Sequence, residues 1–163
     1  MQQNLTQQRL CEVVDYNPDT GVFVWKTQTG PRAQIGAVAG SINVRKYVDI
    51  SIDGRKYVAH RLAWLYTYGV WPTWQIDHID GVRHNNMLSN LRDVPRSINM
   101  QNQRKARKGA LTGLLGVSRH NTRWRARIQT NGVVHRLGTF DTPEEAHAAY
   151  LVAKRQQHIG CTI

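Results

Sequence analysis

The chain has 163 residues, enough for one medium domain or two small ones, and 40% of them are apolar. Its 22 Lys and Arg outnumber its 11 Asp and Glu, and the formal net charge of +11 favours a polyanionic partner. The longest apolar run is far below the ~18 residues that a membrane span needs. The first ten residues lack the features of a secretory signal, and two distant cysteines offer neither a metal-ligand spacing nor a disulfide framework. We therefore expect a cytoplasmic, reducing location and no membrane partner.

The first part of the chain predicts short helices and antiparallel hairpins. In order, its patterns indicate a helix, a turn and a strand at residues 6–14, 16–21 and 22–25. Residues 46–60 predict a hairpin, because two alternating runs flank Asp53-Gly54, a pair that tolerates the positive φ angles of a two-residue turn. Residues 60–69 then predict a buried helix that ends at Gly69.

Residues 75–91 contain two Asp, two His and three Asn in the sequence QIDHIDGVRHNNMLSNL. We expect a strand that contains Asp77-His78, a polar loop that runs to Asn90, a second strand at residues 91–94 and a helix from about Arg96. A carboxylate and an amide oxygen suit Mg²⁺, a hard cation that keeps several of its waters. A histidine that titrates near neutrality suits a general base. Asn85 and Asn86 are expected to be turn-forming residues.

Basic residues are concentrated after this stretch. From Arg83 to Arg136 the chain has twelve basic residues and one acidic residue, Asp93. So one-sided a cluster repels itself unless a polyanion neutralises it, which favours nucleic acid over an anionic membrane surface.

The last third of the chain predicts a small sheet backed by one helix. Three strand-like segments, separated by Asn-Thr and Asn-Gly turns, lie at 116–120, 123–130 and 133–140. A helix then starts at a capping box, with Thr142 as the cap, Pro143 in the first position and Glu145 closing the box. We expect this helix to end at Gly160. Its apolar face would consist of Ala146, Ala149, Tyr150 and Ala153.

The motif DHIDG…NN…SNLR…N resembles the HNH endonuclease family, whose strand–loop–strand–helix unit is the ββα-metal motif. With the upstream segments AHRLAW and IDG, the resemblance covers roughly residues 5–103 and extends to homing endonucleases. It implies that His78 is the general base and that Asn90 orients it. It further implies that Asp77 and Asn99 hold the metal, which would stabilise the leaving 3′ oxygen.

Two details of this ligand set follow from the residues present. Asn99 stands at the third position of the family signature, where the family has histidine; the loss of that nitrogen ligand favours Mg²⁺ or Mn²⁺ over Zn²⁺, and no structural zinc is expected. Asp80 remains an alternative to Asp77 as the carboxylate ligand. Arg96, at the start of the expected helix, is a candidate for supporting the scissile phosphate.

The segment GVSRHNTRWRARIQTNGVVHRLGTFDTPEEAHAAYLVAK is similar to the Apetala-two/ethylene-response-factor DNA-binding domain over about 50 residues. That resemblance implies that the sheet enters the major groove of DNA. The expected DNA-binding residues are Arg119, Arg123, Trp124, Arg125, Arg127 and Arg136. Position 136 commonly carries Trp in the plant pattern, so base preferences do not carry over.

Together these features predict an α+β protein in which N-terminal hairpins lead into a ββα-metal core, followed by a three-stranded antiparallel sheet on one helix. We expect a nuclease domain at residues 1–103, with its ββα-metal core at about 74–103. A basic linker at 104–112 would connect it to a DNA-binding domain at 113–163. The predicted function is a metal-dependent DNA endonuclease, homing-endonuclease-like, that acts on double-stranded DNA as a monomer or weak homodimer. One centre per chain suggests a nick from a monomer, whereas double-strand cleavage would need a dimer or sequential nicking. The alternatives are a sequence-specific DNA-binding regulator with a degenerate nuclease fold and a basic RNA- or ribosome-associated protein.

Overall fold

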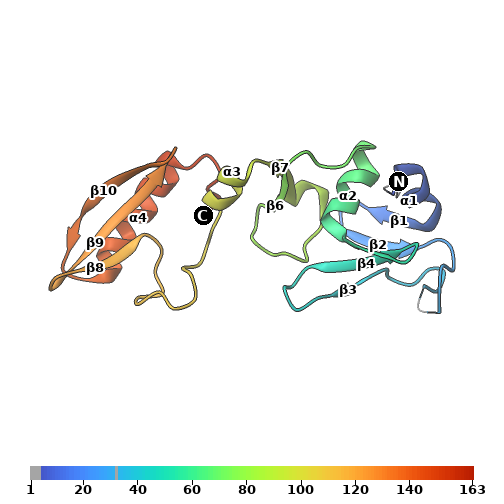
Figure 1. Ribbon diagram of the computed structural model, residues 1–163, viewed down its shortest axis with the longest axis horizontal. Helices are drawn as coiled ribbons and strands as arrows, with labels where there is room; N and C mark the ends of the chain where they lie inside the picture. Colours follow the sequence, from blue (N-terminus) through green and yellow to red (C-terminus); the bar gives the residue numbers. More distant parts are fainter. Residues whose placement is uncertain (1–4, 32) are drawn as a thin grey trace. The chain divides into compact units, whose positions relative to one another are not determined.

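The computed structural model describes residues 5–31 and 33–163 (Figure 1). Contacts between residues divide the chain into two compact units, Met1–Pro95 and Arg96–Ile163. The described residues form four α-helices and small antiparallel sheets, which confirms the mixed α+β class. The predicted boundary of the nuclease domain after residue 103 stays a prediction. In the described part of the chain, no helix is both long enough and apolar enough to cross a membrane.

The first unit consists of two small sheets, two helices and a final hairpin. Its elements are α1 (Gln7–Val13), β1 (Val14–Asn17), β2 (Val22–Trp25), β3 (Ser41–Ile42), β4 (Val48–Ile52), β5 (Arg55–Val58), α2 (Ala59–Tyr68), β6 (Gln75–His78), the 3-10 turn η1 (Leu88–Asn90) and β7 (Leu91–Val94). Strand β1 pairs with β2, and β3, β4 and β5 form a meander in that order. The predicted hairpin is confirmed, with Asp53 at φ 51° and Gly54 at φ 75° in its turn.

The core of the first unit lies between its helices and the two small sheets. Leu10 of α1, Leu62 of α2 and Ile50 of β4 are fully buried. Tyr16 and Phe23 stack across the β1–β2 hairpin, with ring centroids 4.6 Å apart. Burial of these apolar side chains fixes α2, which carries His60, against β4 and β5.

The last hairpin of the first unit has a regular register. β6 and β7 pair antiparallel, with Asp77 opposite Arg92 and His78 opposite Leu91. The predicted strands at Asp77-His78 and at residues 91–94 are therefore confirmed, as is a helix that begins at Arg96. Side chains of adjacent strand residues leave opposite faces, so Asp77 and His78 have different neighbours.

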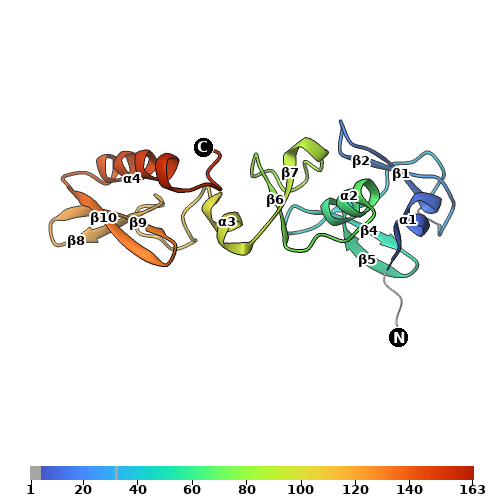
Figure 2. The same ribbon diagram turned by 90° about the horizontal axis from the view of Figure 1, so that it is seen from above.

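The second unit is a three-stranded sheet with a helix on one face, together with a short helix that precedes it. Its elements are α3 (Arg96–Gln101), β8 (Val117–His120), β9 (Arg123–Thr130), β10 (Val133–Phe140) and α4 (Pro143–Gln157). The strand order is β10-β9-β8, and α4 lies along one face of this sheet (Figure 2). Ala126 and Ile128 of β9 are buried, as are Tyr150 and Ala153 of α4.

The ends of α4 show one confirmed prediction and one error. The Thr142 hydroxyl accepts a hydrogen bond from the Glu145 N–H, and the Glu145 carboxylate accepts one from the Thr142 N–H, as predicted. The helix ends at Gln157, however, with His158 as its C-cap, and not at Gly160. Gly160 lies beyond the helix, and its backbone packs closely against Ile98 of α3.

Candidate active site

His78 lies at the end of β6 in a buried cluster of rings. The residue is only 4% exposed. The His60 ring of α2 meets the His78 ring edge-on at 5.1 Å between centroids, and Tyr47 lies 6.0 Å from it. Nε2 of His78 is 3.4 Å from Oδ1 of Asn86. An amide oxygen only accepts, so this contact is a hydrogen bond in the tautomer of His78 that carries its proton on Nε2.

Both histidines of this cluster favour the neutral form. Burial lowers the pKa of His60 to about 3, and the nearby positive charges of a protonated His78 and of Arg61 add to the effect. Burial also lowers the pKa of His78, although the contact with Asn86 and the carboxylates of Asp80 and Asp77 oppose this. A neutral imidazole at neutral pH is the form that can accept a proton.

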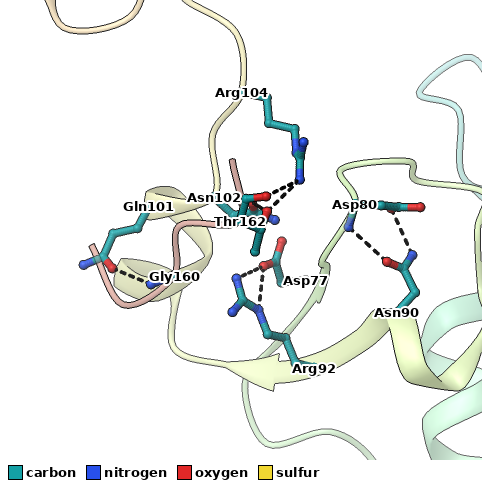
Figure 3. Close-up of polar contacts among 9 residues, drawn as sticks. All are labelled: Asp77, Asp80, Asn90, Arg92, Gln101, Asn102, Arg104, Gly160 and Thr162. Atoms are coloured by element: carbon teal, nitrogen blue, oxygen red, sulfur yellow. Dashed lines mark hydrogen bonds and ion pairs between the residues drawn. The ribbon is translucent and has the colours of Figure 1, made fainter. Parts of the chain in front are cut away.

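The loop from Ile79 to Asn90 is organised around Asp80. Oδ1 of Asp80 accepts hydrogen bonds from the Val82 N–H at 2.7 Å and from Nδ2 of Asn90 at 3.0 Å, and Oδ2 accepts one from Nδ2 of Asn85 at 2.7 Å. Oδ1 of Asn90 in turn accepts the Asp80 N–H at 3.0 Å (Figure 3). Burial tends to raise the pKa of Asp80, but these hydrogen bonds outweigh it and the pKa is lowered. Asp80 is therefore an ionised anchor of the loop.

This arrangement gives Asn90 a definite task. Its Nδ2 also donates to the Asn85 carbonyl at 2.9 Å, so both ends of the amide are used within the loop. Asn90 holds the two ends of the loop together at Asp80, while the side chain that reaches the His78 ring is that of Asn86. That Asn90 orients His78 stays a prediction. These hydrogen bonds of its side chain lie within the loop, so any such effect would act through the loop's conformation.

Asn86 is held in place by the distant β1–β2 hairpin. Its backbone carbonyl accepts a hydrogen bond from the Tyr16 hydroxyl at 2.7 Å, and its side-chain Nδ2 donates to the His84 carbonyl at 3.3 Å. Gly21, at φ 71°, lies so close that a Cβ there would be 2.4 Å from the carbonyl carbon of Asn86. The turn of the β1–β2 hairpin thus sets where the Asn86 amide meets the His78 ring.

Asp77 is buried and paired with an arginine of the neighbouring strand. Nε and Nη2 of Arg92 both donate to Oδ2 of Asp77, at 3.0 and 2.7 Å (Figure 3). The two residues are directly opposite in the β6–β7 register. Arg92 supplies a positive charge that offsets the cost of burying this carboxylate.

The expected metal ligands come from different units of the structure. Asp77 and His78 lie in the first unit, whereas Asn99 and the exposed Arg96 lie on α3 in the second. Within the described residues, no three His, Cys, Asp or Glu side chains gather into a metal-binding group. A carboxylate oxygen and an amide oxygen are both donor types that suit a hard divalent cation, which keeps most of its waters.

The expected DNA-binding residues lie on the sheet of the second unit. β9 alternates, so Ala126 and Ile128 are buried under α4 while Arg125 and Arg127 point to the other face. Arg136 of β10 is directly opposite Arg127 in the register. Arg119 instead lies opposite Trp124, with its guanidinium 5.6 Å from the centre of the indole ring. Arg123 forms an exposed ion pair with Asp141 at 2.8 Å.

Asn86 is the neighbour of His78 that the sequence did not single out. Asn85 and Asn86 look alike in the sequence, and both were expected to form turns. Asn85 does so, because its amide braces Asp80, but Asn86 is 2% exposed and reaches the His78 ring. No local signal separates the two residues, since the difference depends on contacts with Tyr16 and Gly21.

Comparisons with known proteins bear on the segment that holds this site. No curated protein and no solved structure matches the chain. A family model described as HNH endonuclease matches residues 57–101, and this match supports a place in the HNH family for the segment from β5 through β6 and β7 to α3.

Proposed function

We propose that the protein is a metal-dependent DNA endonuclease that hydrolyses phosphodiester bonds, in the manner of homing endonucleases. The observation that carries the proposal is the state of His78. It is a buried, neutral histidine at the end of β6, with an amide oxygen at Nε2, inside the segment that matches the HNH family. A histidine held in this way is suited to take a proton from water.

In this proposal the side chains have separate tasks. His78 takes a proton from the attacking water at Nδ1, in the tautomer whose Nε2–H faces the amide oxygen of Asn86. Asn90 and Asp80 hold the loop so that Asn86 keeps its position. Asp77 and Asn99 would hold the divalent ion, Mg²⁺ or Mn²⁺, and the bound ion would supply positive charge for the phosphoryl oxygens and the leaving 3′ oxygen. Arg96 would support the scissile phosphate.

The second unit supports a nucleic-acid substrate. Arg127 and Arg136 are direct cross-strand neighbours on the sheet face opposite α4, and like charges in such a pair destabilise a sheet. A phosphate backbone between them would turn this repulsion into attraction. The sheet is thus suited to contact duplex DNA, in the manner of the Apetala-two-like domain that the sequence resembles.

The direct test is cleavage of supercoiled plasmid DNA. With Mg²⁺ or Mn²⁺ we expect conversion to the nicked form, since each chain has one candidate centre, and with excess EDTA we expect none. Gel mobility shifts in EDTA should still show DNA binding. Binding without any metal-dependent cutting on varied DNA would contradict the proposal and favour the regulator. Preferential binding of structured RNA would favour the RNA-associated alternative.

Replacing Arg125 and Arg127 together by alanine should weaken DNA binding by about 10-fold or more at moderate salt. The physical reason is that each arginine that contacts a phosphate releases counterions, so the variant should also show a shallower dependence of binding on salt concentration. Fluorescence anisotropy at several salt concentrations measures both quantities, and cleavage at saturating protein should be nearly unchanged.

The matched control for this pair is Arg55→Ala with Lys56→Ala, which removes two cations from β5 in the first unit. If both double variants changed the affinity and the salt dependence equally, the sheet of the second unit would not be the main contact with DNA.

A further inference from the structure

The short helix α3 is held by the segment that follows α4. With six residues and none of them buried, α3 has little stability of its own. The N–H of Gly160 donates to Oε1 of Gln101 at 2.9 Å, at the end of α3. Gly160 also approaches the helix so closely that a Cβ would be 2.3 Å from the carbonyl oxygen of Ile98. Ile98 directly precedes Asn99, the expected metal ligand on α3.

Three further hydrogen bonds tie down the residues directly after α3. The Thr162 hydroxyl donates to Oδ1 of Asn102 and accepts from Nη2 of Arg104, the latter at 2.6 Å (Figure 3). The Lys154 ammonium of α4 donates to the carbonyl of Gln103. Thr162 and Lys154 thus hold three consecutive residues, 102–104.

Lys154 contributes a buried ammonium group to its hydrogen bond with the Gln103 carbonyl. The residue is 1% exposed, and burial lowers the pKa of its side chain. Burying an ammonium group costs free energy unless its donors are used. The position of Gln103 relative to α4 therefore matters to the stability of the second unit.

We propose that Gly160, Thr162 and Lys154 form a brace that sets the position of α3 and, through it, of Asn99. Gly160 and Thr162 act here as positioning residues, because they touch the helix and its exit and not the ion. This inference rests on the proposed function, in which Asn99 holds the metal.

The first test is Gly160→Ala. Gly160 is not in the left-handed region of φ, so alanine strains nothing but its contact with α3. The expected result is a rise of about 10- to 100-fold in the dissociation constant for Mg²⁺, measured by isothermal titration calorimetry, and in the Mg²⁺ concentration that gives half-maximal plasmid nicking, as for other residues that support a metal ligand. DNA affinity in EDTA should stay within about two-fold of the original. Gly30→Ala is the matched control, since Gly30 also avoids the left-handed region and a Cβ there meets nothing within 4 Å.

The second test is a pair of variants at Thr162, which decides the matter if Gly160→Ala also loses DNA binding. Thr162→Ser keeps the hydroxyl and should nick at ordinary Mg²⁺ concentrations, whereas Thr162→Val removes both hydrogen bonds and should need more Mg²⁺. Equal Mg²⁺ dependence of Thr162→Val and Thr162→Ser, or of Gly160→Ala and Gly30→Ala, would overturn the brace. A failure of the unaltered protein to cut DNA at any Mg²⁺ or Mn²⁺ concentration would instead overturn the proposed function itself.

Discussion

Replacing His78 by alanine should lower the rate of plasmid nicking by about 10²- to 10⁴-fold, the usual contribution of a general base. The affinity for DNA in EDTA should remain, because His78 is buried and the exposed arginines of the second unit are untouched. The rate is measured under single-turnover conditions at saturating Mg²⁺, so that neither binding nor product release affects it.

His84→Ala is the matched control for this prediction. His84 lies in the same loop and is exposed, and it is only its backbone carbonyl that accepts the hydrogen bond from Asn86, so alanine preserves that contact. Added imidazole should partly restore nicking by His78→Ala and should have no effect on His84→Ala. Full activity of His78→Ala would rule out this residue as the base.

The parts of the fold that could be predicted from the sequence are those with local signals. The capping box at Thr142, the Asp53-Gly54 turn and the αL cap at Gly69 each depend on residues within one turn of the element. The predicted end of α4 was wrong because it depended on a residue whose main contact is distant in the sequence. Gly160 looks like a helix stop in the sequence, but its lack of a side chain serves the close approach to Ile98, some sixty positions earlier.

The candidate site divides in the same way. The alternation and turn residues around Asp77, His78 and Asn90 were enough to predict a strand, a loop and a second strand. Nothing local predicted that Asn86 would reach His78, because the Tyr16 hydroxyl that holds its carbonyl lies 70 residues away. The pairing of Asp77 with Arg92 could not be predicted either, since it requires the exact β6–β7 register. Residue types were thus readable from the sequence, whereas their partners depended on tertiary structure.

Replacing Asp77 by asparagine should lower nicking at limiting Mg²⁺ by about 10²-fold or more, because a metal ion contributes several kcal/mol of charge stabilisation and a carboxylate is its strongest expected ligand. The change also deprives Arg92 of its counter-ion. Breaking a buried pair typically costs about 3–5 kcal/mol of unfolding free energy. The Arg92 side chain is 25% exposed, so we expect a loss below that range. Urea denaturation measures the stability, and a Mg²⁺ titration of nicking measures the metal requirement.

Two further variants separate the metal from the ion pair. Arg92→Gln breaks the same pair but keeps the carboxylate, so it should lose stability as Asp77→Asn does and yet retain an ordinary Mg²⁺ requirement. Asp53→Asn removes the acid from the exposed pair with Arg9, and it should leave both the stability and nicking nearly unaltered. If Asp77→Asn and Arg92→Gln showed the same Mg²⁺ dependence, the carboxylate of Asp77 would serve the hairpin alone. Asp80 would then remain as the carboxylate candidate, although its three hydrogen bonds within the loop already commit it to holding that loop closed.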